Sequence, residues 1–164
     1  MSKISVLMSV YKKENPEYLR ASLESILVQT RTADEILLIE DGPLTQELYQ
    51  VVAEYQKKCD YLHVHAMEQN VQLGRALAKG VELCQYDLIA RMDTDDIAMP
   101  DRLEKEGAYM EAHPEVNVVG GAIREFNDEG TIDRVKNMPK TQEEILEYVK
   151  VRNPLNHMTV MYRK

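Results

Sequence analysis

Short continuous apolar runs alternate along the first two thirds of the chain with segments whose apolar residues recur at helical spacing. The runs have the length of strands that are buried in a sheet, and they cover residues 3–10, 35–40, 61–66, 86–92 and 116–121. Helices are predicted after Asn15-Pro16, from about Thr45, after the loop at 70–75, and after Pro100. This alternation predicts an α/β fold, with a mostly parallel central sheet between two layers of helices.

The pattern weakens after residue 121. Residues 127–130 predict a hairpin turn between two short strands, and Thr141 with Glu144 forms a capping box that predicts a helix. Residues 153–164 predict a loop and then a strand. Without a linker rich in Pro, Gly or Ser, residues 1–164 are expected to form a single domain, and its last strand suggests a longer protein.

Composition narrows the class of protein. The chain has 164 residues, of which 44% are apolar, and its net charge of -8 argues against binding to nucleic acid or to an anionic membrane surface. No apolar run reaches the roughly 20 residues of a membrane-spanning helix, and no signal peptide is visible, so a cytoplasmic location is expected. Cys59 and Cys84 lack metal-ligand spacing and are predicted to be reduced packing residues.

The run at 86–92 ends in three carboxylates within four positions, Asp93, Asp95 and Asp96. The carboxyl ends of parallel strands form the edge of an α/β sheet where ligands bind. Carboxylates this close together repel one another, so the cluster should be solvated, used as a helix cap, or neutralised by a cation. Capping of the helix after Pro100 needs one aspartate, whereas this loop carries three.

Three chemistries place such a motif after a strand. A calcium loop of the EF-hand type is rejected because its obligatory glycine is Ala98 here. An aspartyl-phosphate phosphatase normally carries its motif after the first strand, which disfavours that class. The third is a site that holds Mg²⁺ or Mn²⁺ against a nucleoside diphosphate, and Ser9, Tyr11 and Asp41 would then follow the first two strands at the same edge. Arg75 lies at the start of a helix near that edge.

The chain resembles the nucleotide-sugar-binding domain of family 2 glycosyltransferases, which have a GT-A fold. The resemblance spans nearly all 164 residues. The matching stretches are residues 5–11, 22–30, 35–42, 70–80, 89–96, 100–103 and 157–161.

By this resemblance, Asp41 would contact the base, and Asp93 with Asp95 would form the Asp-x-Asp pair. Asp95 or Asp96 would hold the metal ion, Mn²⁺ or Mg²⁺. The resemblance also assigns Ser9, Tyr11 and Arg75 to the nucleotide pocket. Two further residues have two interpretations each. Arg91 either balances the negative charge of the carboxylates or is a surface residue of its strand. His157 either lies near the acceptor or is a structural residue.

The resemblance implies an inverting glycosyltransferase of polysaccharide or cell-envelope biosynthesis. The donor would be a nucleotide sugar, with UDP favoured, and the acceptor a saccharide or a lipid-linked molecule, with peripheral association at the inner face of the plasma membrane. The family's catalytic base is expected beyond Lys164, on a truncated acceptor side, so no base is named and transfer by these 164 residues is expected to be poor. A non-catalytic nucleotide- or cation-binding module is the alternative. A nucleotidyltransferase is disfavoured because residues 11–14 are not a glycine-rich loop.

Overall fold

A six-stranded sheet in the order β3-β2-β1-β4-β8-β5 forms the centre of the computed structural model, which describes residues 1–127 and 132–164. Its strands are β1 (Ile4–Val10), β2 (Glu35–Glu40), β3 (Leu62–Ala66), β4 (Leu88–Arg91), β5 (Val118–Val119) and β8 (Met161–Arg163). Strands β3, β2, β1 and β4 run parallel, whereas β8 is antiparallel to both β4 and β5. The predicted mostly parallel sheet is confirmed.

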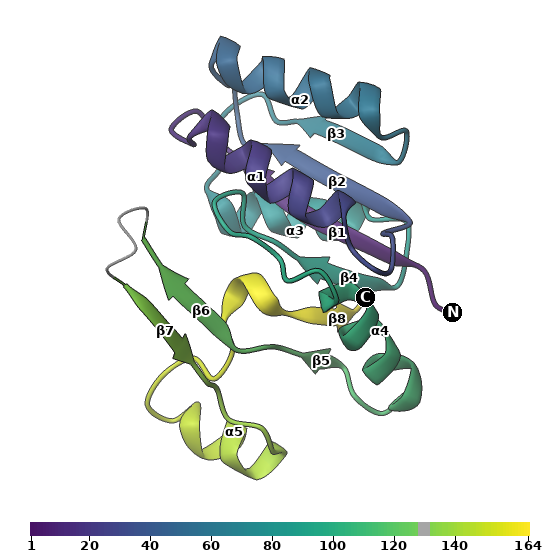
Figure 1. The fold of residues 1–164 in the computed structure, drawn as a ribbon, viewed down its shortest axis with the longest axis vertical. Helices are drawn as coiled ribbons and strands as arrows, with labels where there is room; N and C mark the ends of the chain where they lie inside the picture. The colour runs from purple at the N-terminus through teal and green to yellow at the C-terminus, as the bar shows by residue number, and fades with distance from the viewer. Residues whose placement is uncertain (128–131) are drawn as a thin grey trace.

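Helices cover both faces of this sheet. They are α1 (Pro16–Leu27), α2 (Gln46–Lys58), α3 (Leu73–Leu83) and α4 (Arg102–Ala112). The chain also forms α5 (Gln142–Tyr148), which lies away from the sheet, and a short 3₁₀ helix, η1 (His157–Thr159) (Figure 1). Apolar residues of α1, α2 and α4 pack with one face of the sheet, and those of α3 pack with the opposite face. The predicted α/β/α arrangement of three layers is therefore confirmed (Figure 1).

Side-chain caps fix the starts of several helices where the sequence predicts them. Asn15 accepts a hydrogen bond from the Glu17 amide at α1, and Thr45 accepts one from the Leu48 amide at α2. Helix α4 begins at Arg102 with Asp101 in the N-cap position, so the acidic cluster does not cap it. Cys59 and Cys84 are buried and free, as predicted.

The predicted strand after α4 and the first residue of α3 differ from a simple pattern. The strand expected over 116–121 is reduced to two residues, because β5 pairs only with the three-residue strand β8 among the described residues. In α3, Leu77 and Gly80 are buried, whereas Leu73 is 43% exposed. Leu73 is the first residue of the helix and lies at the end of the sheet, where side chains line a cavity and do not pack in the core.

The last third of the chain adds a smaller unit beside the sheet (Figure 1). Strands β6 (Ile123–Phe126) and β7 (Asp133–Lys136) pair antiparallel, which confirms the two short strands, while residues 128–131 of the predicted turn lie outside the described residues. Thr141 and Glu144 form the predicted capping box of α5. Over the described part of the chain, every helix is too short or too polar to cross a membrane.

Candidate nucleotide and metal site

One cavity of about 390 Å³ lies at the carboxyl ends of β1, β2 and β4. Because these parallel strands are neighbours, the residues that follow them meet at one edge of the sheet. The cavity is lined by Ser9, Tyr11, Glu14, Asp41, Asn70, Gln72, Leu73, Asp93, Thr94 and Asp95. The structure thus brings together five of the seven site residues predicted from the sequence.

Asp41 is 4% exposed and fixed in place from two sides. One carboxylate oxygen accepts the Val71 amide at 2.6 Å, and the other accepts the Asn70 side-chain amide at 2.9 Å. Gly42, with a φ of 84°, lets the chain turn so closely that an added Cβ would lie 2.6 Å from the Asn70 backbone nitrogen. Asp41 is therefore a rigid acceptor in the cavity wall.

Asn70 and Gln72 are pocket residues to which the sequence analysis gave no role. Asn70 belongs to a matching stretch, so its position before the third helix was the available signal. Gln72 has a φ of 71° and a ψ of 152°, a conformation that residues other than Gly rarely adopt. A glutamine in the sequence gives no indication of it.

The loop that carries the acidic cluster is anchored to α1 and the residues after it by buried polar side chains. The Ser22 hydroxyl donates to the Asp93 carbonyl at 2.8 Å, and the Ser25 hydroxyl accepts the Ala98 amide at 3.0 Å. Gln29 donates to the Met99 carbonyl at 2.8 Å. These contacts fix the backbone on both sides of the cluster, so the carboxylates project from a preorganised loop.

The three carboxylates present oxygen atoms that all lie within 4.8 Å of one another. Burial and the neighbouring charges of Asp93 and Asp95 raise the pKa of Asp96 from 3.8 to about 6. Hard oxygen ligands at this spacing suit Mg²⁺ or Mn²⁺, and a divalent cation would offset the repulsion among them. The donor set therefore fits the predicted metal.

Arg91 lies beneath this cluster and is 2% exposed, so the interpretation as a surface residue is wrong. Its guanidinium forms an ion pair with Asp93 and offsets part of the rise in the pKa of Asp96. Apart from this ion pair, which is made by Nη1, the described residues offer no hydrogen-bond acceptor to the Arg91 guanidinium. Its backbone carbonyl accepts a hydrogen bond from Arg102 at 2.8 Å. The structure favours the interpretation in which Arg91 balances the carboxylates.

His157 lies on η1, close enough to Arg91 and Asp93 to be affected by their charges. Burial, followed by the positive charge of Arg91, lowers the pKa of His157, which keeps the imidazole neutral near pH 7. Arg75 occupies the first turn of α3, is exposed, and lies outside the residues that line the cavity. The predicted pocket role of Arg75 is thus the one that the geometry supports least.

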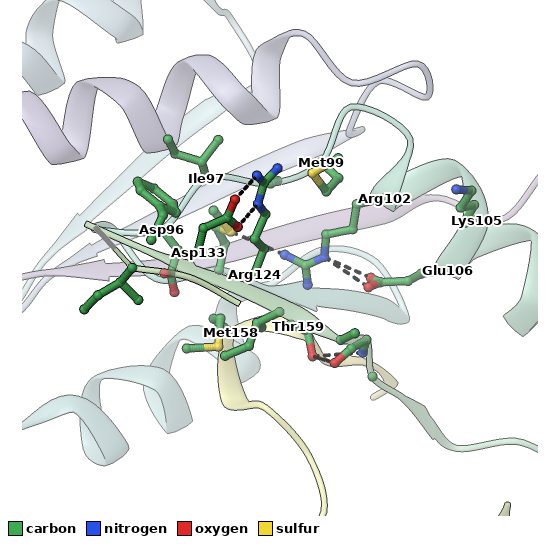
Figure 2. A pocket seen from close by; sticks show the side chains of 18 residues that line it. Asp96, Ile97, Met99, Arg102, Lys105, Glu106, Arg124, Asp133, Met158 and Thr159 are labelled. Carbon is green, nitrogen blue, oxygen red and sulfur yellow. Dashed lines mark hydrogen bonds and ion pairs between the residues drawn. The ribbon is translucent and has the colours of Figure 1, made fainter. Parts of the chain in front are cut away.

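A second and larger cavity, of about 800 Å³, lies on the other side of the acidic loop. Asp96 lines it, together with residues from the start of α4 and from the β6–β7 hairpin (Figure 2). The segment from Asp93 to Asp96 therefore separates a polar cavity at the strand ends from this second cavity.

Three relatives are informative. An uncharacterized glycosyltransferase of Haemophilus influenzae is 48% identical over 99% of this chain and 61% of its own length. The amylovoran biosynthesis glycosyltransferase AmsE of Erwinia amylovora is 44% identical over 98% of the chain and 59% of its own length. The UDP-Gal:alpha-D-GlcNAc-diphosphoundecaprenol beta-1,3-galactosyltransferase of Escherichia coli is 35% identical over 99% of the chain and 58% of its own length. The chain thus spans about three fifths of the length of these relatives.

Solved structures support the fold. TarS of S. aureus, residues 1–349 in complex with UDP-GlcNAc, superimposes with a TM-score of 0.74 at 20% identity, over 98% of this chain and 45% of that one. The mannosyltransferase PcManGT of Pyrobaculum calidifontis, in complex with GDP-Man and Mn²⁺, superimposes with a TM-score of 0.71 at 12% identity, over 99% of this chain and 44% of that one. The fold of the chain is GT-A, as the resemblance predicted.

The sequence profile of glycosyl transferase family 2 matches residues 5–164, which is almost the whole chain. The matched region contains the strand ends, the acidic loop and η1. The chain belongs to glycosyl transferase family 2.

Proposed function

We propose that the chain binds the nucleotide-sugar donor of a glycosyl transfer, with UDP as the favoured nucleotide. The observation that carries this proposal is the convergence of Ser9, Tyr11, Asp41, Asp93 and Asp95 on one cavity at the strand ends. UDP-sugars are named for the relative from E. coli and for the TarS complex, which supports the choice of UDP.

Asp41 is the proposed reader of the base. After it accepts hydrogen bonds from Val71 and Asn70, each carboxylate oxygen retains a second lone pair that can accept the imide N–H of uracil. Cytosine presents an unprotonated nitrogen at the same position, so a fixed carboxylate disfavours it. Tyr11 is 43% exposed at the cavity and offers an aromatic face to the base.

Asp95 and Asp96 are the proposed metal ligands, with Asp93 beside them. A bound Mn²⁺ or Mg²⁺ neutralises charge on the diphosphate that leaves. Asp93 is held by Arg91 and by the backbone contact to Ser22, so it keeps its position next to the donor. The chain thereby fixes the orientation of the carboxylates before the donor binds.

The proposed reaction is a displacement with inversion at the anomeric carbon. An acceptor hydroxyl oxygen forms the new bond to that carbon, the bond to the diphosphate oxygen breaks, and a base takes the hydroxyl proton. No residue of this chain is assigned as that base. The proposed acceptor is a saccharide or a lipid-linked saccharide at the inner face of the plasma membrane, because the relative from E. coli is named for a diphosphoundecaprenol acceptor.

Calorimetry with UDP, with and without Mn²⁺, tests the donor site. We expect Mn²⁺-dependent binding that Asp95→Asn weakens at least tenfold, while Asp101→Asn leaves it unchanged. Asp101 is a matched control because it is a nearby carboxylate that pairs with Lys105 outside the cluster. Absence of UDP binding by the wild type, or equal binding by Asp95→Asn, would contradict the proposal.

A second experiment separates the transferase from a non-catalytic binding module. Release of UDP from UDP-sugars is measured with saccharide acceptors and with lipid-linked acceptors. Acceptor-dependent release that is lost in Asp95→Asn supports the transferase. Binding of UDP without acceptor-dependent release by the full-length protein favours the module.

A further inference from the structure

The cavity of about 800 Å³ beside the acidic loop has walls from two parts of the fold. One wall is the segment from Asp96 to Met99 with the start of α4, and the other is β6 with residues 120–122, together with residues 132 and 133 beside it (Figure 2). We call this cavity the hairpin groove. Its volume falls within the roughly 300–1,000 Å³ that is typical of small-molecule sites.

Five of the six charged side chains that line the hairpin groove are paired, and the sixth is Asp96 of the acidic cluster. Arg124 holds Asp133 through two contacts of 2.6 Å, and Arg102 contacts both oxygens of Glu106 at 3.1 and 3.2 Å (Figure 2). Lys105 pairs with a carboxylate outside the lining, that of Asp101. These charges are therefore already compensated and are poorly placed to bind a phosphate or a carboxylate.

The uncharged polar group in the lining is engaged as well. Thr159 Oγ1 accepts the Gly121 amide at 2.9 Å and donates to the Asn156 carbonyl at 2.9 Å. A saccharide needs free hydrogen-bonding groups to replace the water that it loses on binding. Most of the remaining lining is apolar, so the groove suits a hydrocarbon better than a sugar.

Large apolar side chains stand exposed on both walls. Ile97 and Met99 are 55% and 68% exposed on the loop side, and Phe126 and Ile132 are 58% and 47% exposed on the hairpin side. Such a grouping of exposed apolar residues around a cavity is typical of a ligand-binding groove. A chain between the two walls would remove them from water.

The groove is continuous with the acidic cluster through Asp96. Asp96 lines the groove, whereas its neighbours Asp93 and Asp95 line the cavity of about 390 Å³ at the strand ends. An acceptor whose hydrocarbon lies in the groove would therefore place its head group beside Asp96, next to the donor. This continuity points to a part of the acceptor, and not to an unrelated partner.

We propose that the hairpin groove binds the hydrocarbon chain of a lipid-linked acceptor, one molecule at a time. The inference rests on the proposed transfer reaction for the identity of the ligand. The groove itself is defined by its apolar walls, its paired charges and its contact with the acidic loop.

The test uses decyl β-glucoside below its micelle concentration and methyl β-glucoside, which has the same head group without the chain. We expect the decyl compound to bind at least tenfold more tightly, as measured by calorimetry. Phe126→Ser and Met99→Ser, one on each wall, should each weaken its binding at least fivefold. Leu146→Ser is the matched control, because Leu146 is 53% exposed on α5 and lines neither cavity.

Equal binding of the two glucosides would overturn the proposal, as would an equal loss of binding in Leu146→Ser. Binding to phosphatidylcholine vesicles without binding to the monomeric decyl compound would show a membrane-contact surface and would also overturn it. UDP binding, measured on the same variants, should not change. If the decyl compound binds but UDP with Mn²⁺ does not, the proposed function fails, and the assignment of the chain as an acceptor tail fails with it.

Discussion

Replacing Arg91 with Met is expected to destabilise the metal-free protein more than the manganese-bound protein. Arg91 is 2% exposed, forms an ion pair with Asp93 and offsets part of the rise in the pKa of Asp96. In the absence of a cation, its guanidinium supplies positive charge beneath three carboxylates that lie within 4.8 Å of one another. Met keeps an unbranched apolar stem and carries no charge, so the variant removes the guanidinium and its ion pair.

The size of the effect follows from two opposing contributions. Removal of one partner from a buried ion pair costs about 3–5 kcal/mol. The Asp93 side chain is 24% exposed, so water partly solvates the carboxylate that is left, and the guanidinium nitrogens that lack hydrogen bonds to described residues no longer have to be buried. We therefore expect a loss of roughly 2 kcal/mol in the free energy of unfolding, below the range for a fully buried pair.

Urea unfolding of the wild type, Arg91→Met and Arg91→Lys, each in EDTA and in saturating Mn²⁺, measures this difference. The loss in Arg91→Met should shrink in Mn²⁺, because the ion replaces the missing charge and binds the native state more tightly. Arg91→Lys retains a charge and should lose less in EDTA. Equal stability of Arg91→Met and wild type in EDTA would refute the reasoning, and so would a loss that Mn²⁺ leaves unchanged.

Further predictions concern the pH response and the packing of α3. Burial and the neighbouring carboxylates raise the pKa of Asp96 from 3.8 to about 6, so the native state in EDTA holds this proton more tightly than the unfolded state. The stability that this proton contributes is fully present below pH 3.8 and is lost as the pH rises through about 6. In urea unfolding, Asp96→Asn should reduce the dependence of the free energy of unfolding on pH over this range. An unchanged dependence would contradict the assignment. Calorimetry should show Mn²⁺ affinity falling as the pH drops through about 6, because protons compete for the same oxygen atoms. Gly80→Ala would place a Cβ 2.3 Å from Leu7 Cδ1 in the core, so its free energy of unfolding should fall by about 1–2 kcal/mol. Gly74→Ala meets open space, so its free energy of unfolding should rise by up to about 1 kcal/mol. Urea unfolding measures both. A Gly80→Ala variant as stable as Gly74→Ala would show that Leu7 moves at no cost.

The sheet could be predicted from the sequence because its inner strands are continuous apolar runs. All six residues of β2 are buried, and β1 has one partly exposed residue, so both patterns are unambiguous. The position of β8 could not be predicted, because its insertion between β4 and β5 depends on antiparallel pairing between segments more than 40 residues apart.

The residues proposed to bind the donor and the metal ion were easier to predict than the residues that hold them in place. Asp41 and the acidic cluster follow strands directly, which indicates their place at the sheet edge. The contact between Ser22 and the Asp93 carbonyl joins residues 71 positions apart, and a serine on a helix usually faces water. The burial of Arg91 could not be predicted either, since a charged residue in a strand is normally expected at the surface.

The support from the first helix bears on what a metal ion would do at this site. Ser22, Ser25 and Gln29 fix the backbone on both sides of the cluster through contacts of 2.8 to 3.0 Å that involve no carboxylate. The loop therefore has its shape from uncharged hydrogen bonds, while Arg91 compensates part of its charge. A cation that binds to a loop already in place spends little free energy on reorganisation. We therefore expect Mn²⁺ to change the charge of the loop between the two cavities and to leave its backbone where it is.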